Sequence, residues 1–158
     1  MRVLVVCLGN ICRSPMAEGW LSARIAQTPE LTDRVEVDSA GLGGWHAGDP
    51  PDPRAIATAA AYGIDISHQR ARKLRADDFR ADTLILCADA GILQQTYRRG
   101  PATSAAGLHR MLEWAGRPAP WDLADPYQGG PADFEAVWNR IDEAGPGMIG
   151  RLKRELGA

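Results

Sequence analysis

The stretch that decides the fold reads Val3-Leu4-Val5-Val6-Cys7-Leu8-Gly9-Asn10-Ile11-Cys12-Arg13-Ser14-Pro15. Its first part, residues 3–6, is an apolar and mostly β-branched run, which predicts a buried strand. The middle part, residues 8–13, contains Gly9 and Asn10, which tolerate positive φ, and therefore predicts a tight loop. The Ser-Pro pair that closes the stretch supplies an N-cap at Ser14 and a first helical residue at Pro15, so we expect a helix to begin there.

A strand, a tight loop and a helix N-terminus in this order predict a cradle for anions. Backbone N–H groups of the anion-binding loop (residues 8–13) are expected to point inward, and the helix dipole adds positive potential. Cys7 follows the predicted strand, and these surroundings favour a nucleophilic thiolate over a thiol. The planar guanidinium of Arg13 can bind two oxygens of a phosphoryl group at once. The stretch therefore predicts a reaction centre as well as a binding site.

The bulk composition limits the classes of function. The chain has 158 residues, which suits one domain spanning residues 1–158 with a sizeable core. A net charge of −2 gives no indication of nucleic acid or an anionic membrane as partner. The first residues do not resemble a signal peptide, and no apolar run is long enough to span a bilayer. Three cysteines do not make a disulfide framework, so we expect a reducing, cytoplasmic location.

Apolar spacing and turn residues divide the chain into alternating strands and helices. Apolar stripes, caps and glycine stops predict helices over residues 15–27, 53–62, 92–98 and about 134–152. Short β-branched runs predict strands over residues 3–6, 35–37 and 83–87. Residues 108–114 fit either a fourth strand or a helical turn, and we favour the strand. Pro146, between two glycines, is expected to break or kink the last helix between Asp142 and Gly147.

This alternation predicts an α/β fold with a parallel sheet and helices on both of its faces. Ligands of such sheets bind beyond the carboxyl ends of the strands. Cys7, Ser39 and Asp89 all follow predicted strands, so we expect them at one rim of the sheet.

Ester cleavage at a thiolate also requires an acid that protonates the leaving oxygen. Asp125 is the candidate, because it lies in a Pro- and Gly-rich loop, residues 118–131, which we expect to be free to move. Pro126 favours an extended conformation for the aspartate before it.

Cys7, five residues, Arg13 and Ser14 together resemble the signature of the cysteine-dependent protein tyrosine phosphatases. The segment C-L-G-N-I-C-R-S-P-M-A-E near the start of the chain resembles the sequence found in the low-molecular-weight branch of that group. Asp125-Pro126-Tyr127 matches the D-P-Y that supplies the general acid in this branch. The resemblance extends over nearly the whole chain through Ser39-Ala40-Gly41, Trp45-His46, Asp52-Pro53-Arg54-Ala55 and Gly63-Ile64 before His68 and Arg72.

The resemblance implies a three-layer αβα fold with a four-stranded parallel sheet in the order 2-1-3-4 and a phosphate-binding loop after the first strand. It implies hydrolysis of phosphotyrosine esters and small aryl phosphates through a phosphocysteine intermediate. The expected substrates are phosphotyrosine-bearing proteins, and the expected enzyme is a monomer without cofactor or metal. Cys7, Arg13 and Asp125 would be catalytic. Phosphate and substrate would contact Leu8, Gly9, Asn10, Ile11, Cys12, Ser14, Trp45 and Tyr127.

The resemblance further implies that Asn10 is held in a left-handed conformation by Ser14, Ser39 and His68. A strained Asn of this kind persists only if its surroundings enforce it, since the strain costs about 1–3 kcal/mol. Trp45 would either form a wall of the cleft or pack in the core. His46 and His109 receive no role, and the three histidines lack the spacing of a metal site.

Departures from the family pattern are few. Gln128 stands where relatives often carry a second Tyr, and Cys87-Ala88-Asp89 stands where many carry Met-Asp, so the role of Asp89 is open. Cys12 is either a partner that traps oxidised Cys7 as a disulfide or a packing residue.

Three other functions are compatible with this loop. Arsenate reduction would need a cysteine relay from Cys87, but no cysteine follows it in the chain. Relatives that hydrolyse phosphoarginine carry Thr where Ile11 stands, and a bulkier apolar Ile favours a flat aryl ester. A silent module that only binds phosphoproteins is disfavoured because Cys7, Arg13 and Asp125 are all present.

Overall fold

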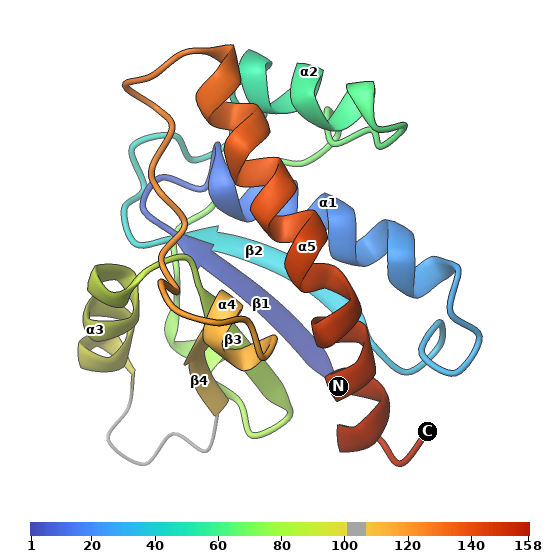
Figure 1. Cartoon of the computed structure of the whole chain (residues 1–158). Coiled ribbons are helices and arrows are strands. Elements are labelled where there is room, and N and C mark those ends of the chain that lie inside the picture. The colour runs from blue at the N-terminus through green and yellow to red at the C-terminus, as the bar shows by residue number, and fades with distance from the viewer. Residues whose placement is uncertain (101–106) are drawn as a thin grey trace.

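The computed structural model describes residues 1–100 and 107–158. Four parallel strands form one sheet in the order β2-β1-β3-β4, as the resemblance implies (Figure 1). The strands are β1 (Arg2–Cys7), β2 (Glu36–Gly41), β3 (Thr83–Cys87) and β4 (Gly107–Arg110). β1 is central: its Cys7 lies opposite Gly41 of β2, and its Val6 opposite Cys87 of β3. The carboxyl ends of the first three strands therefore meet at one rim, as predicted.

Helices cover both faces of the sheet, which makes the three layers (Figure 1). They are α1 (Arg13–Ala26), α2 (Pro53–Ala61), η1 (Ala76–Phe79, a 3-10 helix), α3 (Ala90–Arg99), α4 (Met111–Trp114) and α5 (Pro131–Glu155). Residues 108–114 contain both structures that the sequence left open, since β4 runs directly into α4.

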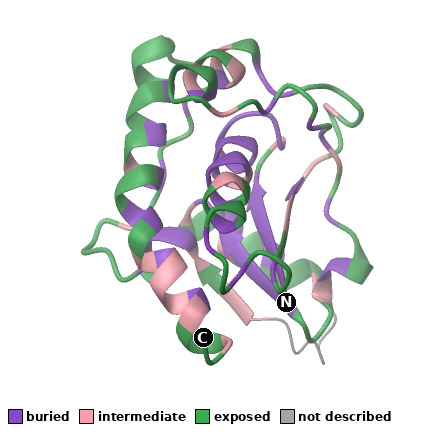
Figure 2. Ribbon diagram, turned by 90° about the vertical axis from the view of Figure 1, so that its right-hand side faces the viewer, coloured by how far each residue is buried: buried purple, intermediate pink, exposed green. Residues whose placement is uncertain are grey.

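The core is divided by the sheet because side chains of a strand alternate between its faces. Val3 and Val5 pack with α1 and α5 in one cluster, whereas Leu4 and Val6 pack with η1 and α3 in the other. Every residue of β1 is buried, which Figure 2 shows as a purple strand at the centre of the molecule. This burial on both faces explains the continuous apolar run with which the sequence begins.

Of the break or kink expected at Pro146, the break does not occur, since α5 continues from Pro131 to Glu155. The flanking glycines are sites of close packing instead. A Cβ added at Gly145 would lie 2.0 Å from the Trp20 ring, and one at Gly147 would lie 2.0 Å from the Ala115 carbonyl oxygen. We infer that packing of α5 on α1 and α4 outweighs the one backbone hydrogen bond that a proline cannot donate.

Candidate active site

The anion-binding loop connects β1 directly to α1. α1 begins at Arg13, two residues before the predicted first helical residue Pro15, and its N-cap position is Cys12 rather than Ser14. Asn10 has a φ of 59° and is the one non-glycine residue of the described chain with a positive φ. The sequence signal of Gly9-Asn10 for an unusual backbone is therefore confirmed at Asn10.

Three hydrogen bonds hold the Asn10 side chain. Its Nδ2 donates to Ser14 Oγ at 2.8 Å and to Ser39 Oγ at 2.9 Å, as the resemblance implies. Its Oδ1 accepts from the backbone N–H of Arg72 at 3.0 Å, whereas His68, the implied third partner, is exposed. This part of the expectation is wrong because the chain at Arg72–Leu74 is hydrogen-bonded to Gly41 and so delivers a backbone donor to the loop.

Cys7 is buried beside this arrangement, with 3% of the residue exposed. Its Sγ is 3.0 Å from Ser14 Oγ. Because Ser14 Oγ already accepts from Asn10, the hydroxyl hydrogen of Ser14 is free to donate to the sulfur. A donor at this position stabilises a thiolate.

Arg13 is buried and its guanidinium is fixed on two sides. Nη1 donates to Asp89 Oδ2 at 2.6 Å and to the Leu123 carbonyl oxygen at 2.9 Å, while Nη2 lies 3.8 Å from Asp125 Oδ2. Asp89, whose role the sequence left open, thus orients Arg13 and also caps α3 by accepting from Ile92 N. Its position just after β3 at the shared rim was the signal for this contact.

A cleft opens above the loop and brings together most of the sequence-predicted residues, although Asn10 and Ser14 are not part of its lining. It is lined by Cys7, Leu8, Gly9, Ile11, Cys12, Arg13, Trp45, His46, Asp125 and Tyr127. Trp45 is 69% exposed, which excludes core packing, and Tyr127 is 47% exposed. His46, to which the sequence assigned no role, lies in the same cleft with its ring centroid 6.5 Å from that of Tyr127. Its place beside Trp45 on one Gly-rich loop was the available signal.

Asp125 is accessible in this cleft, with 43% of its side chain exposed. Its Oδ1 accepts from the backbone N–H of Tyr127 at 3.1 Å, and its Oδ2 faces Arg13. A carboxyl group near a sulfur nucleophile and a guanidinium is suited to proton transfer.

The other two cysteines are buried thiols. Burial, together with the nearby carboxylates of Asp52 and Asp125 and the Cys7 sulfur, raises the pKa of Cys12 to about 12. Burial raises the pKa of Cys87 to about 12 as well, although Thr96 Oγ1 lies 3.7 Å from its sulfur. Cys87 packs in the core cluster on the α3 face of the sheet, whereas Cys12 packs with α1 and lines the cleft.

Comparison with known proteins identifies the family. The family model for low molecular weight phosphotyrosine protein phosphatase matches residues 2–158. The chain belongs to this family. A low molecular weight protein-tyrosine-phosphatase of Streptomyces coelicolor is 37% identical over 98% of this chain and 95% of its own length. The Sus scrofa low molecular weight phosphotyrosine protein phosphatase is 36% identical over 87% of each chain.

Solved structures agree with this assignment. A protein tyrosine phosphatase from Entamoeba histolytica superposes with a TM-score of 0.87 at 29% identity, over 99% of this chain and 98% of that one. A structure described as the Drosophila arginine phosphatase gives the same TM-score at 29% identity, over 97% of this chain and 98% of its own. The chain is therefore a phosphatase of the hydrolase class. In the part that the structure describes, no helix has the length and apolarity needed to cross a membrane.

Proposed function

We propose that this phosphatase hydrolyses phosphotyrosine esters and small aryl phosphates through a thiolate at Cys7, with Asp125 as general acid. The observation that carries the proposal is the convergence of Cys7, Arg13 and Asp125 on one cleft walled by two exposed aromatic rings. The phosphoprotein substrate, the cytoplasmic location, the monomeric state and the single domain over residues 1–158 remain predictions.

In the first step, Cys7 Sγ attacks phosphorus, a sulfur–phosphorus bond forms and the bond to the phenolic oxygen breaks. Asp125 gives its proton to that oxygen, so the alcohol leaves neutral. In the second step, water attacks phosphorus, Asp125 takes a proton from the water, and the thiolate and inorganic phosphate are released. Arg13 and the inward N–H groups of the loop stabilise the equatorial oxygens in both steps.

The depth of the cleft supports an aryl substrate. Cys7 is 3% exposed at its bottom, while Trp45 and Tyr127 are exposed at its rim. A tyrosyl ring spans this depth and can stack on both walls, whereas the short side chain of phosphoserine holds phosphorus too close to its own backbone. A misplacement of about 1 Å can already cost 10²-fold in rate, so phosphoserine is expected to be a poor substrate.

Phosphoarginine hydrolysis is the second candidate, because one of the similar structures is described as an arginine phosphatase. Ile11 lines the cleft in this chain, and its apolar side chain favours a flat ring over a charged guanidine. Ile11→Thr should shift kcat/KM towards phosphoarginine peptides. If the unaltered protein prefers phosphoarginine over phosphotyrosine in matched peptides, the substrate assignment fails while the thiolate mechanism survives.

The other two candidates receive less support. The arsenate relay would begin at Cys87, which is fully buried on the α3 face of the sheet, away from the cleft cysteines. A silent binding module would bind phosphate without turnover. A turnover assay with a generic aryl phosphate separates that module from an enzyme.

The mechanism is tested with two variants and a series of aryl phosphates. Cys7→Ser should abolish turnover while inorganic phosphate or vanadate still binds, because the cradle is intact. Asp125→Asn should lower kcat/KM, which reports the first step, by about 10²–10⁴ for phenyl phosphate and much less for esters whose phenols need no proton. Retention of substantial turnover by Cys7→Ser in EDTA would exclude the thiolate. An equal loss for all leaving groups in Asp125→Asn would exclude the general acid.

A further inference from the structure

In the described part of the chain, the segment that carries Asp125 receives hydrogen bonds from the rest of the fold through one side chain. We call residues 124–129 the acid loop. Its internal hydrogen bonds are Tyr127 N to Asp125 Oδ1 and Gly129 N to the Pro126 carbonyl oxygen. Among the described residues, the hydrogen bonds that reach it from elsewhere in the fold come from Arg54. Nη1 of Arg54 donates to the Gly129 carbonyl oxygen at 2.8 Å, and Nη2 donates to the Tyr127 carbonyl oxygen at 3.0 Å.

Arg54 is itself fixed before it reaches the acid loop. Its Nε and Nη2 donate to the two carboxylate oxygens of Asp52 at 3.0 and 2.9 Å, a bidentate pair. The guanidinium also lies 4.5 Å over the ring of Phe134, near the start of α5. Asp52 is the N-cap of α2, since its Oδ1 accepts from Arg54 N at 2.8 Å. We call the contact of Arg54 with the acid loop the clamp. It is anchored at a capped helix end rather than in a free loop.

The same helix end is tied to the anion-binding loop. The backbone N–H of Asp52 donates to the Ile11 carbonyl oxygen at 2.8 Å. A continuous path of hydrogen bonds thus runs from Ile11 through Asp52 and Arg54 to Tyr127, beside Asp125. This path connects the loop that follows the nucleophile to the loop that carries the proposed acid, although the two are more than a hundred residues apart in sequence.

We propose that Arg54 is a positioning residue for the reaction: it holds the acid loop at the distance from Cys7 at which Asp125 can protonate the leaving oxygen. This inference rests on the proposed function, because it takes Asp125 as the general acid. An arginine suits the task because its rigid fork serves one carboxylate and two carbonyl groups at once, which a lysine cannot do. Proton transfer is sensitive to such placement, since donor and acceptor must come within hydrogen-bond distance.

The test is a comparison of leaving groups in Arg54→Met, which keeps an unbranched side chain at the start of α2 but removes the guanidinium and its hydrogen bonds. We expect kcat/KM for phenyl phosphate, whose phenolate needs a proton, to fall by about 10- to 100-fold. For an aryl phosphate with a strongly acidic phenol, kcat/KM should fall less than about threefold. Arg54→Lys keeps the charge without the fork and should show the same pattern in weaker form. A uniform loss across leaving groups in both variants would overturn the proposal.

A double-mutant cycle separates positioning from a general effect on the fold. In the Asp125→Asn background there is no acid to position, so adding Arg54→Met should cost less than about threefold on phenyl phosphate. If the loss in the double variant equals the product of the two single-variant losses, Arg54 acts independently of Asp125. That result would also overturn the proposal. If Asp125→Asn alone shows no leaving-group dependence, the proposed function fails first. If it shows that dependence and Arg54→Met does not, only the present inference fails.

Arg140 provides the matched control. It also donates to two backbone carbonyl groups of the same connection, those of Pro120 and Asp122, but these precede Asp125. Leu123, whose N–H donates to the Ala88 carbonyl oxygen, separates them from the acid loop. Arg140→Met should therefore leave the ratio of kcat/KM between the two leaving groups unchanged within about twofold. If Arg140→Met changes that ratio as much as Arg54→Met does, any loosening of the connection disturbs Asp125. Arg54 would then not be a specific clamp, and the proposal would be overturned.

Discussion

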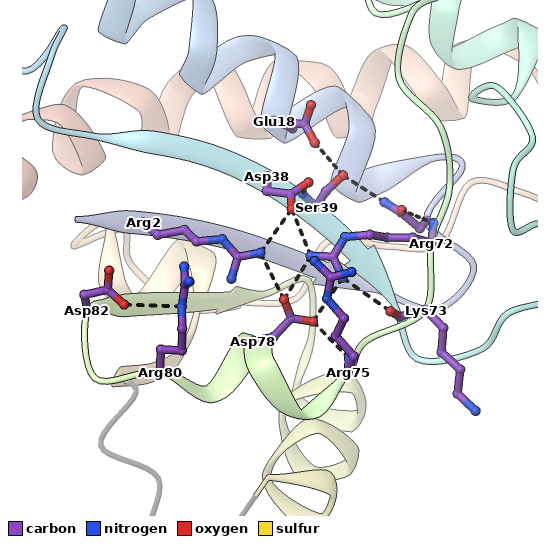
Figure 3. Close-up of polar contacts among 11 residues, drawn as sticks. Arg2, Glu18, Asp38, Ser39, Arg72, Lys73, Arg75, Asp78, Arg80 and Asp82 are labelled. Atoms are coloured by element: carbon purple, nitrogen blue, oxygen red, sulfur yellow. Dashed lines mark hydrogen bonds and ion pairs between the residues drawn. The ribbon is translucent and has the colours of Figure 1, made fainter.

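Asn10 concentrates the strain of the active site in one residue. Its positive φ is unfavourable for a side chain with a Cβ, and its amide is held by Ser14, Ser39 and the backbone of Arg72. Behind it, Ser39 Oγ donates to Glu18 Oε1 at 2.7 Å (Figure 3). The Ser39 hydroxyl has a single hydrogen, which it donates to Glu18. The lone pairs of Ser39 Oγ are therefore available to accept the hydrogen bond from Asn10 Nδ2. The geometry of the loop thus extends to a carboxyl group on α1.

Glu18 makes stability depend on pH in the neutral range. Burial raises the pKa of Glu18 to about 7 from 4.5, with Asp38 adding to the shift and the Ser39 hydrogen bond and Arg72 opposing it. The folded state therefore binds a proton that the unfolded state releases, so this contribution to stability is lost as pH rises from about 4.5 to about 7. Relative to Glu18→Gln, the wild type should lose about 2 kcal/mol of unfolding free energy between pH 5 and pH 8. Urea unfolding at both pH values measures this, and parallel pH dependence in the two proteins would contradict it.

Cys12 offers a test of redox protection. Its pKa of about 12 keeps it a thiol at neutral pH, so peroxide should oxidise Cys7 first. The Cys12 sulfur can then attack the Cys7 sulfenic acid, with water leaving and a disulfide forming. Mild peroxide should inactivate the wild type reversibly, whereas Cys12→Ser should recover less activity in dithiothreitol. Equal recovery of both proteins would leave Cys12 as a packing residue.

At the scale of an element, α5 depends on close approach to its neighbours. The Ala115 oxygen that a Cβ at Gly147 would meet belongs to the backbone, which cannot move aside as a flexible side chain can. Gly147→Ala should lower the unfolding free energy by about 1–3 kcal/mol. Gly150 lies in the same helix with only the end of Arg154 nearby, at 3.6 Å, so Gly150→Ala should be neutral or stabilising by up to about 1 kcal/mol. Thermal or urea unfolding compares the two, and equal effects would show that helix propensity, not packing, decides.

At the scale of the whole molecule, one network of ion pairs joins segments far apart in the chain. Asp78 in η1 is fully buried and accepts from Arg2 of β1 at 3.0 Å and from Arg72 at 3.0 Å. Asp38 of β2 bonds the same two guanidinium groups, so four segments meet at this point (Figure 3). Arg72 is shared with the active site, since its backbone N–H holds Asn10. Through Arg72, the network therefore connects η1, β1 and β2 to the anion-binding loop.

Removing one charge from this network should be costly. Burial acts to raise the pKa of Asp78, but hydrogen bonds from Arg72, the Arg75 N–H and Arg2 hold it below its ordinary value. The stability that Asp78 contributes is therefore present above the unfolded pKa of about 3.8 and is lost as pH falls through the lower folded value. Asp78→Asn should cost about 3–5 kcal/mol at pH 7, because two guanidinium groups lose a buried partner.

The exposed pair of Asp82 and Arg80, at 3.6 Å, is the control for that experiment. Asp82→Asn should change stability by less than about 1 kcal/mol, since surface ion pairs contribute little. The difference between the two variants should also shrink towards pH 3, where Asp78 is mostly protonated in the unfolded chain. A cost for Asp78→Asn as small as that for Asp82→Asn would mean that the network adds no net stability.

The sequence by itself determined the features that rest on local patterns. One short stretch holds the apolar run before Cys7, the Gly-Asn pair and the Ser-Pro pair. These local signals predicted a strand, an unusual turn and a helix start within two residues of the observed one. The alternation of strands and helices predicted the parallel sheet, because βαβ crossovers leave few other arrangements. The site residues Cys7, Arg13 and Asp125 were found through motif spacing, and the fold brings them to one cleft.

The tertiary structure alone decided the contacts between segments that are distant in the chain. The backbone of Arg72 replaces His68 beside Asn10, and backbone donors leave no trace in the residue type. Locally, the sequence Gly145-Pro146-Gly147 predicts a helix break. Packing against Trp20 and Ala115 nevertheless keeps α5 continuous. The clamp by Arg54 likewise depends on carbonyl groups that any residue could offer. Local propensity is carried by neighbouring residues, whereas these contacts depend on which backbone atoms the packed fold brings together.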